Sequence, residues 1–187
     1  MLESRTRDKP RPVKLFCGLI AKADALGRVR GLLVERFGEI DCESPALTFT
    51  FTTYYREEMG EGLVRTWVAF RPLRERAYLP LAKHTAIALE ASLAVDGKRV
   101  ANIDPGYVDD AQVVLSTAKN YSHRIYIGMG YYAEVTLTYE RKAFKFLGWT
   151  YPDYKIPEAL AFFNDARSAY AAEMRNHTSG AWETLER

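Results

Sequence analysis

Hydrophobic and polar positions in the first half of the chain predict four strands. Val13–Ile20 is a short apolar run with the length of a buried strand. Ala46–Thr53 alternates large apolar residues with threonines, which indicates a strand with one buried face. Leu63–Arg71 predicts a third strand, with Val64, Thr66, Val68 and Phe70 on one side, and Lys98–Ile103 predicts a fourth strand. We expect the fourth strand to stop at Asp104-Pro-Gly-Tyr107, because that sequence favours a turn.

Two helices are predicted between these strands. Apolar residues recur at helical spacing within Ala21–Phe37, and Gly38 stands where a C-terminal cap belongs. A second apolar stripe runs through Leu79–Val95, with Pro80 in the first turn. The polar segment Thr53–Gly62 is interpreted as a loop. The resulting order, β-α-β-β-α-β, is the ferredoxin-like arrangement.

The second half of the chain predicts further elements around this core. Val108–Lys119 fits either a helix or a strand. His123–Ile127 and Tyr131–Tyr139 are typical of a β-hairpin that turns at the glycines between them. Another strand is expected at Ala143–Trp149 and an amphipathic helix at Pro157–Arg175. We therefore predict an α+β fold with a ferredoxin-like core, extended by a C-terminal β-hairpin and a terminal helix.

The length and the net charge of the chain limit its possible domain organisation and binding partners. The 187 residues predict one α+β domain at 12–175, between a mobile tail at 1–11 and a loose tail at 176–187. The formal net charge is +2. That balance argues against broad electrostatic capture of nucleic acid or of an anionic membrane. The sequence leaves the oligomeric state open.

The ends of the chain and the cysteines predict a cytoplasmic protein. Met1–Pro12 lacks the apolar core of a signal peptide, and no run approaches the length of a bilayer span. Cys17 and Cys42 make neither a disulfide framework nor a zinc motif, which fits a reducing compartment.

Motifs for several mechanisms are absent from the sequence. It contains no P-loop, no complete dinucleotide-binding glycine pattern and no nucleophile elbow of a serine hydrolase. Neither H-E-x-x-H nor C-x-x-C occurs, and the three histidines are scattered, so no metal site is predicted. The sequence identifies no cofactor.

The predicted hairpin carries the most informative group of polar residues. A three-residue turn places Arg124 opposite Glu134 and Tyr126 opposite Tyr132, all on one face. Such a face suits an anionic, ring-bearing ligand, because it combines charged hydrogen-bond donors with stacking surfaces. The alternative is a solvated face with a cross-strand ion pair, which the sequence by itself favours because such pairs are common. Strand alternation puts His123 on the opposite, apolar face.

Candidate catalytic residues are those able to transfer a proton near neutral pH. His123 leads this set, although a histidine on an apolar face is more often a core residue. Its expected partners in proton transfer are Glu134 and Asp104. The helix positions Lys83 and Glu90 are seven apart and share one face. Both could line a cleft, but we expect this face to be solvated.

Candidate ligand-binding residues would hold an anion and flank a ring. We expect Lys14, Lys119 and Arg124 to bind the anionic group. Tyr126 and Tyr132 would flank the ring. Asn102 is added because it precedes Asp104 by two positions and points the same way at the end of a strand.

Short motifs along the chain together carry a family resemblance. They are Pro12-Val-Lys-Leu-Phe16 with Gly18, Tyr55 with Glu58-Met-Gly60, Asn102-Ile-Asp-Pro-Gly-Tyr107, His123-Arg-Ile-Tyr126, Tyr132-Ala-Glu-Val-Thr-Leu137 and Trp149-Thr-Tyr-Pro-Asp-Tyr154. Over roughly residues 12–172 the chain resembles the bacterial domain-of-unknown-function family 4416. Some members bear the label GTP-binding protein, and the P-loop is missing here.

The resemblance implies a set of positions and no established activity. The charged and amide residues inside the motifs are Lys14, Glu58, Asn102, Asp104, His123, Arg124, Glu134 and Asp153. A motif set of this composition resembles the signature of an enzyme or ligand-binding family.

Three classes of function follow from the sequence. The first is an enzyme or binder of a phosphorylated or nucleotide-like small ligand. The second is an RNA-binding or protein-interaction module, since ferredoxin-like sheets can stack bases on exposed aromatic residues. The third is a sensory or structural homo-oligomer. We rank the small-ligand hypothesis first.

Overall fold

One large antiparallel sheet organises the structure, a computed structural model that describes residues 10–177. Within this range nine strands follow the order β2-β4-β1-β5-β6-β8-β7, with β3 paired to β4 and β9 paired to β8. The strands are β1 Val13–Lys22, β2 Ile40–Glu43, β3 Leu47–Thr48, β4 Leu63–Arg74, β5 Ala101–Val108, β6 Gln112–Thr117, β7 Ile125–Gly128, β8 Tyr131–Glu140 and β9 Ala143–Phe146.

Four α-helices accompany the sheet within the described residues, which confirms the α+β class. They are α1 Leu26–Phe37, α2 Arg56–Met59, α3 Leu79–Leu93 and α4 Pro157–His177. The short 3-10 turns are η1 Ala23–Ala25, η2 Arg76–Tyr78 and η3 Pro152–Lys155.

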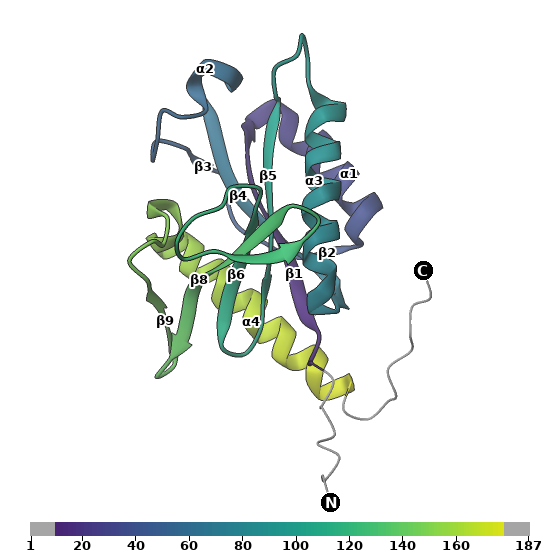
Figure 1. Cartoon of the computed structure of the whole chain (residues 1–187), viewed down its shortest axis with the longest axis vertical. Helices are drawn as coiled ribbons and strands as arrows, with labels where there is room; N and C mark the ends of the chain where they lie inside the picture. Colours follow the sequence, from purple (N-terminus) through teal and green to yellow (C-terminus); the bar gives the residue numbers. More distant parts are fainter. Residues whose placement is uncertain (1–9, 178–187) are drawn as a thin grey trace, which may run out of the picture.

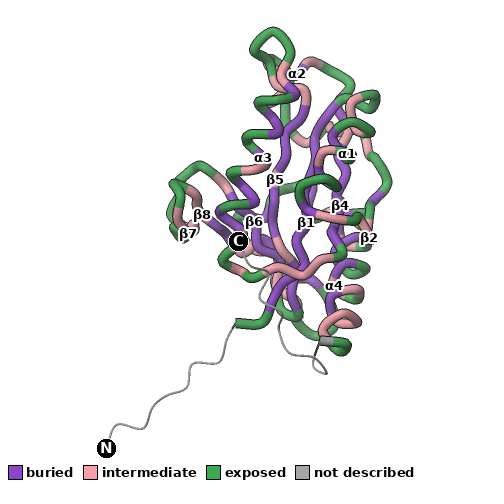
Figure 2. Tube along the Cα trace, turned by 90° about the vertical axis from the view of Figure 1, so that its right-hand side faces the viewer, coloured by how far each residue is buried: buried purple, intermediate pink, exposed green. Residues whose placement is uncertain are grey.

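Helices α1 and α3 cover one face of the sheet (Figure 1). Val29, Leu33 and Phe37 recur every four residues, so one stripe of α1 packs into the core. Gly38 ends the helix with φ 106° and donates its N–H to Val34 O, as the cap prediction requires. The central strands β1, β4 and β5 are buried, whereas the loop tips and the outer sides of the helices are exposed (Figure 2).

Helix α4 covers part of the opposite face. Phe162 and Phe163 pack edge-on against Phe16 of β1, with ring centroids 6.4 and 5.1 Å apart. Tyr170 donates a hydrogen bond to Pro12 O, so α4 lies against the end of the sheet where β1 begins. At the other end of this face, residues 49–55 and η3 lie over the strands instead.

Strand β5 runs through the sequence predicted to be a turn. Pro105 pairs with Cys17 of β1, and the β5–β6 ladder begins one residue later at Gly106. In an antiparallel strand the N–H and C=O of one residue point to the same neighbour, so the N–H that Pro105 lacks would face β6. Its carbonyl accepts a hydrogen bond of 2.7 Å from Ser116 Oγ. A side chain of β6 therefore replaces the missing ladder contact, and the turn prediction was wrong.

The second predicted strand is also different in the structure. Sheet pairing within Ala46–Thr53 covers Leu47–Thr48, and the chain then leaves the sheet. Phe49 and Phe51 line a cavity instead, with their ring centroids 5.7 Å apart. Farther along β4, the paired strand is Ile40–Glu43, a four-residue segment that was not predicted from the sequence.

The structure also shows which elements the other predicted segments form. Val108–Lys119, which fitted either element, contains β6. The polar loop carries the single turn α2. The predicted tails at 1–11 and 176–187 fall mostly outside the described residues, and α4 continues to His177. Among the helices of residues 10–177, none is long and apolar enough to cross a membrane.

Candidate functional site

A cavity of about 520 Å³ lies at the end of the sheet face that α4 leaves uncovered. Strands β5 and β6 part there, because their ladder begins at Gly106 and the earlier residues of β5 have no strand partner on that side. Segments 49–55, 115–119 and 151–154 complete the wall. The charged residues that line it are Arg65, Lys83, Glu90, Arg99, Asp104, Lys119, Arg124, Glu134 and Asp153.

Two side chains of α3 hold the open edge of β5. Lys83 Nζ donates to Ile103 O at 3.1 Å, and the Ile103 N–H donates to Glu90 Oε1 at 2.6 Å. The helix thus supplies both hydrogen bonds that a neighbouring strand would otherwise make. Lys83 and Glu90 are buried, so the predicted solvated face of this helix was wrong.

Asp104 is anchored from two sides. Lys83 Nζ donates to its Oδ1 at 3.1 Å, and Asn102 Nδ2 donates to its Oδ2 at 2.6 Å. Burial alone would raise the pKa of Asp104, but the charges of Lys83 and Arg65 outweigh burial and hold it below its ordinary value. The cavity therefore contains a fixed carboxylate at neutral pH.

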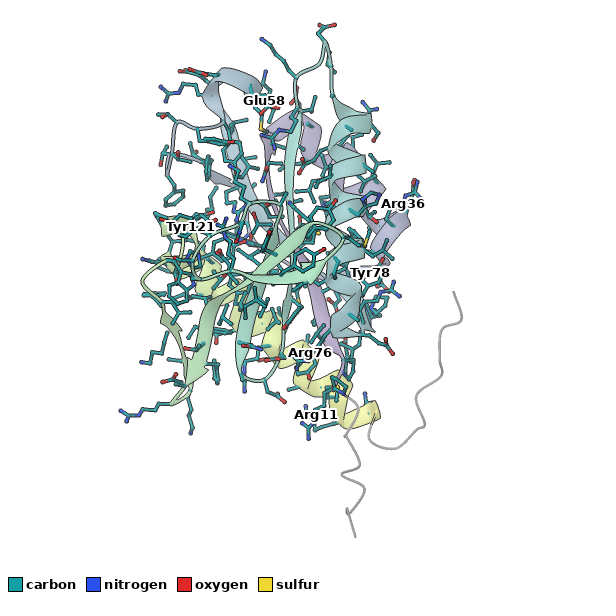
Figure 3. All side chains as sticks on the ribbon, viewed as in Figure 1. Arg11, Arg36, Glu58, Arg76, Tyr78 and Tyr121 are labelled. Carbon is teal, nitrogen blue, oxygen red and sulfur yellow. The ribbon has the colours of Figure 1, made fainter. Side chains whose placement is uncertain are left out.

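Arg99 ties the loop over the cavity to the sheet. Its guanidinium donates to both carboxylate oxygens of Glu58 at 2.7 and 2.6 Å, and to Asn102 Oδ1 at 3.0 Å. The hydrogen bonds from Arg99 lower the pKa of Glu58. Glu58 lies at the end of the molecule opposite Arg11 and Arg76 (Figure 3). This bidentate pair fixes α2 beside the start of β5.

Arg65 forms the floor of the cavity. Its side chain is 2% exposed, and its guanidinium lies 4.6 Å from the Trp67 ring centroid and 5.2 Å from that of Tyr154. The backbone beneath it is Gly18, where a Cβ atom would lie 2.9 Å from Arg65 Nη2. Gly18 therefore leaves the space that the guanidinium occupies.

The donors of Arg65 are largely unused by the protein. Nε lies 3.0 Å from Asp153 Oδ2, but this ion pair lacks hydrogen-bond geometry. Within residues 10–177, neither Nε nor Nη1 of Arg65 has a hydrogen-bond partner, and the buried Tyr154 hydroxyl also lacks one. Burial raises the pKa of Asp153, although the Arg65 charge opposes the shift. A buried cation with unused donors is costly unless an acceptor approaches it.

Glu134 is a buried hydrogen-bond acceptor in the wall of the same cavity as Arg65. Arg124 Nε donates to Oε2 at 2.7 Å, and His123 Nε2 lies 3.0 Å from the same oxygen. The His123 ring stacks on Trp149 with centroids 4.7 Å apart. His123 thus shares a carboxylate with Arg124 and does not lie on the opposite face. Both residues precede β7, so strand alternation does not govern them.

The structure gathers five of the predicted site residues in the cavity wall: Asn102, Asp104, Lys119, Arg124 and Glu134. His123 reaches it through Glu134. Tyr126 is opposite Tyr132, as predicted, but the cavity wall traced through the described residues includes neither ring. Lys14 lies elsewhere, paired with Asp41 and Glu173.

Sequence reasoning missed Arg65, the most buried cation of the cavity. The signal was present, because Arg65 and Trp67 alternate with Val64, Thr66 and Val68 in a predicted strand and therefore share its other face. An arginine beside a tryptophan on the second face of such a strand indicates a buried charge site.

Comparison with known proteins places the chain in a family. The family model described as a domain of unknown function (DUF4416) matches residues 11–170. The chain belongs to this family. The DUF4416 match confirms the resemblance seen in the motifs, and it contains every cavity residue named above. No curated protein and no solved structure matches the chain significantly.

No group of three or more His, Cys, Asp or Glu residues in the described part of the chain is placed to hold a metal ion.

Substitution of Asp104 by asparagine is expected to lower the free energy of unfolding by roughly 1–3 kcal/mol at pH 7, because Lys83 loses a charged partner. The folded pKa of Asp104 lies below the unfolded value of about 3.9, so its contribution is complete above about pH 4 and is lost as the pH falls through the folded pKa. Urea unfolding at pH 7, 4 and 3 should show the difference from wild type shrinking. The exposed Asp24→Asn variant is the control, and a pH-independent difference would contradict the assignment.

Proposed function

We propose that the chain binds a small anionic ligand, phosphorylated or nucleotide-like, in the cavity between β5, β6 and η3. The observation that carries the proposal is Arg65, a buried guanidinium whose Nε and Nη1 find no hydrogen-bond partner in residues 10–177. An oxyanion would accept from these donors and neutralise the charge. The cavity volume of about 520 Å³ is in the range of small-molecule sites.

Aromatic residues of the cavity wall support a ring-bearing ligand. Phe49, Tyr54, Tyr55 and Tyr151 line it, and Tyr54 is exposed at the rim. Lys119 Nζ donates to the Tyr54 hydroxyl at 3.2 Å, so a cation stands at the entrance. The mouth of the cavity thus combines a stacking surface with positive charge.

Two carboxyl groups of the cavity differ in their affinity for protons. The charges of Lys83 and Arg65 keep Asp104 ionised, whereas burial raises the pKa of Asp153. Such divergent pairs suit acid and base roles. We propose Asp104 as the proton acceptor and Asp153 as the donor when the ligand is also a substrate, with His123 acting through Glu134.

We also propose that β1, α1, β2, β4, α3 and β5 form a ferredoxin-like unit within the larger sheet. The support is the local order β2-β4-β1-β5, antiparallel throughout, with both helices on one face. The strands β6 to β9 then extend it on one side, and β6 and β8 supply part of the cavity wall.

A thermal-shift screen of nucleotides, sugar phosphates and acidic metabolites tests the binding proposal. A ligand at about one hundred times its dissociation constant stabilises the folded state by about 2.7 kcal/mol. For a chain of this size the melting temperature should rise by roughly 5–10 °C. We expect Arg65→Gln and the rim variant Lys119→Ala to reduce the shift, and the exposed control Arg71→Gln to retain it.

The outcomes separate the candidate functions. Stabilisation that is lost in the Arg65 and Lys119 variants supports the cavity as the binding site. Absence of any shift with well-folded wild-type protein contradicts the proposal. A salt-dependent mobility shift of an RNA oligomer would then favour the RNA-binding alternative.

A further inference from the structure

Glu134 brings to the cavity a carboxylate oxygen that the protein does not use. Its side chain is 2% exposed. Oε2 contacts Arg124 and His123, whereas Oε1 has no hydrogen-bond partner within the described part of the chain. A buried carboxylate oxygen without a donor is as costly as a buried donor without an acceptor. Oε1 therefore points to a hydrogen-bond donor supplied by a ligand.

Arg124 orients Glu134, and its donors are already engaged within the protein. Nε donates to Glu134 Oε2, Nη1 to Lys119 O at 2.9 Å, and Nη2 to the Tyr151 hydroxyl at 2.9 Å. This arrangement contrasts with Arg65, where two nitrogens are unused. Arg124 is accordingly a positioning residue, whereas Arg65, although it forms an ion pair with Asp153, keeps two nitrogens without a hydrogen-bond partner.

His123 completes the orientation of the carboxylate. Its Nε2 meets the same oxygen as Arg124, and its ring is fixed against Trp149 at an interplanar angle of 12°. Two contacts on Oε2 leave Oε1 as the free oxygen of a rigidly held group, and Glu134 lies in the cavity wall. Preorganised polar groups of this kind determine which ligands are accepted.

Arg65 and Glu134 line the same cavity and lack opposite partners: Arg65 lacks hydrogen-bond acceptors, and Glu134 Oε1 lacks a donor. We infer that the ligand is bifunctional: an acidic group pairs with the Arg65 guanidinium, and an N–H donor group of the same molecule pairs with the Glu134 carboxylate, whose buried Oε1 becomes accessible by a small side-chain shift when the ligand binds. This inference rests on the proposed function and names its ligand class. A donor that carries positive charge or belongs to a polarised N–H is preferred, because the acceptor is a carboxylate. The class comprises phosphorylated or carboxylated compounds with an amino group or a nitrogen ring.

The test uses probe pairs that share the acid and differ in the N–H group. Phosphoethanolamine is compared with ethyl phosphate, and adenosine and guanosine monophosphates are compared with ribose 5-phosphate, by isothermal titration calorimetry. Wild-type protein should bind at least one N–H-bearing probe about 10-fold or more tightly than its partner, as expected for a hydrogen bond to a charged group. Glu134→Gln should reduce this ratio to about one.

Controls separate this inference from the proposed function. Glu140→Gln changes an exposed glutamate at the end of the same strand and should keep the preference. Arg65→Gln should weaken both members of each pair. Glu134→Asp withdraws the carboxylate by one methylene and should lose the preference too, which provides a second variant if Glu134→Gln does not fold.

Each result tests the bifunctional-ligand inference, the proposed function, or both. Arg65-dependent phosphate binding without an N–H preference, or a preference that survives in Glu134→Gln, overturns the bifunctional ligand and retains the proposed function. Failure of every probe to bind wild-type protein overturns both.

Discussion

Replacement of Lys14 by methionine is expected to lower the free energy of unfolding by roughly 3–5 kcal/mol, as for the removal of one partner from a buried ion pair. The Lys14 side chain is 0% exposed, and Nζ lies 2.7 Å from Asp41 Oδ2 and 3.0 Å from Glu173 Oε1. It also donates to Phe70 O at 3.1 Å. Methionine fills a similar volume but leaves the carboxyl groups of Asp41 and Glu173 without their cation. The ion pairs of Lys14, which join β1 to β2 and α4, are then lost.

The loss should depend on pH. Burial raises the pKa of Glu173, and Lys14 opposes that shift, so removal of Lys14 raises the folded pKa further. A group with a raised folded pKa loses stability as the pH rises through that value. Urea unfolding should therefore show a larger deficit for Lys14→Met at pH 8 than at pH 5. The exposed Lys98→Met variant is the control, and a deficit below about 1 kcal/mol would refute a structural role.

The same variant tests the sequence-based assignment of Lys14 to ligand binding. Lys14 lies at the end of the sheet near α4, away from the cavity wall. We expect folded Lys14→Met protein to retain wild-type affinity for any ligand found in the screen. If Lys14→Met protein loses ligand affinity at a low pH where its stability is restored, Lys14 takes part in ligand binding.

Gly106→Ala is expected to destabilise the fold by roughly 3 kcal/mol, at the upper end of overpacking effects. A Cβ atom at this position would contact the carbonyl oxygen of Val114 and lie 2.5 Å from Phe16 Cζ. Neither neighbour can retreat easily, because Val114 belongs to the β6 backbone and Phe16 is packed against α4.

The matched control is Gly31→Ala, in the exposed middle of α1. A Cβ there meets nothing within 4 Å. The same chemical change should stabilise the protein by about 0.5–1 kcal/mol, because glycine is a poor helix former. Thermal and urea unfolding of the two variants should move in opposite directions. Equal effects would mean that β5 and β6 separate more easily than their packing indicates.

Local patterns in the sequence predicted the elements whose stability comes from their own hydrophobic stripe. The apolar spacing of α1 and the Gly38 cap are confirmed, since both depend on residues within one or two turns. The pairing of Tyr126 with Tyr132 was also predicted correctly, although Gly128 pairs with Tyr131 and the register shifts between Tyr126 and Gly128. The predicted Arg124–Glu134 contact forms as well, from a position just before β7. Five site residues were identified because charged residues cluster near that hairpin and at one strand end.

Tertiary contacts decided where local signals and long-range partners disagreed. Asp104-Pro-Gly-Tyr107 has the composition of a turn, yet Cys17 and Ser116 hold it as strand β5. Lys83 and Glu90 become buried because the edge of β5 needs partners that β6 does not provide. No short segment of the sequence shows that the edge of β5 needs these hydrogen-bond partners.

The sequence by itself determined the α+β class, the main helices and strands, and the family, because these depend on periodicity and on motifs along the chain. The site was decided by the tertiary structure. Arg65 stands above Gly18 and beside Asp153, residues separated by long stretches of chain and joined by sheet pairing and η3. Unused donors on Arg65 and an unused acceptor on Glu134 exist only once folding has removed water from both, which is why the proposed ligand class rests on packing and not on composition.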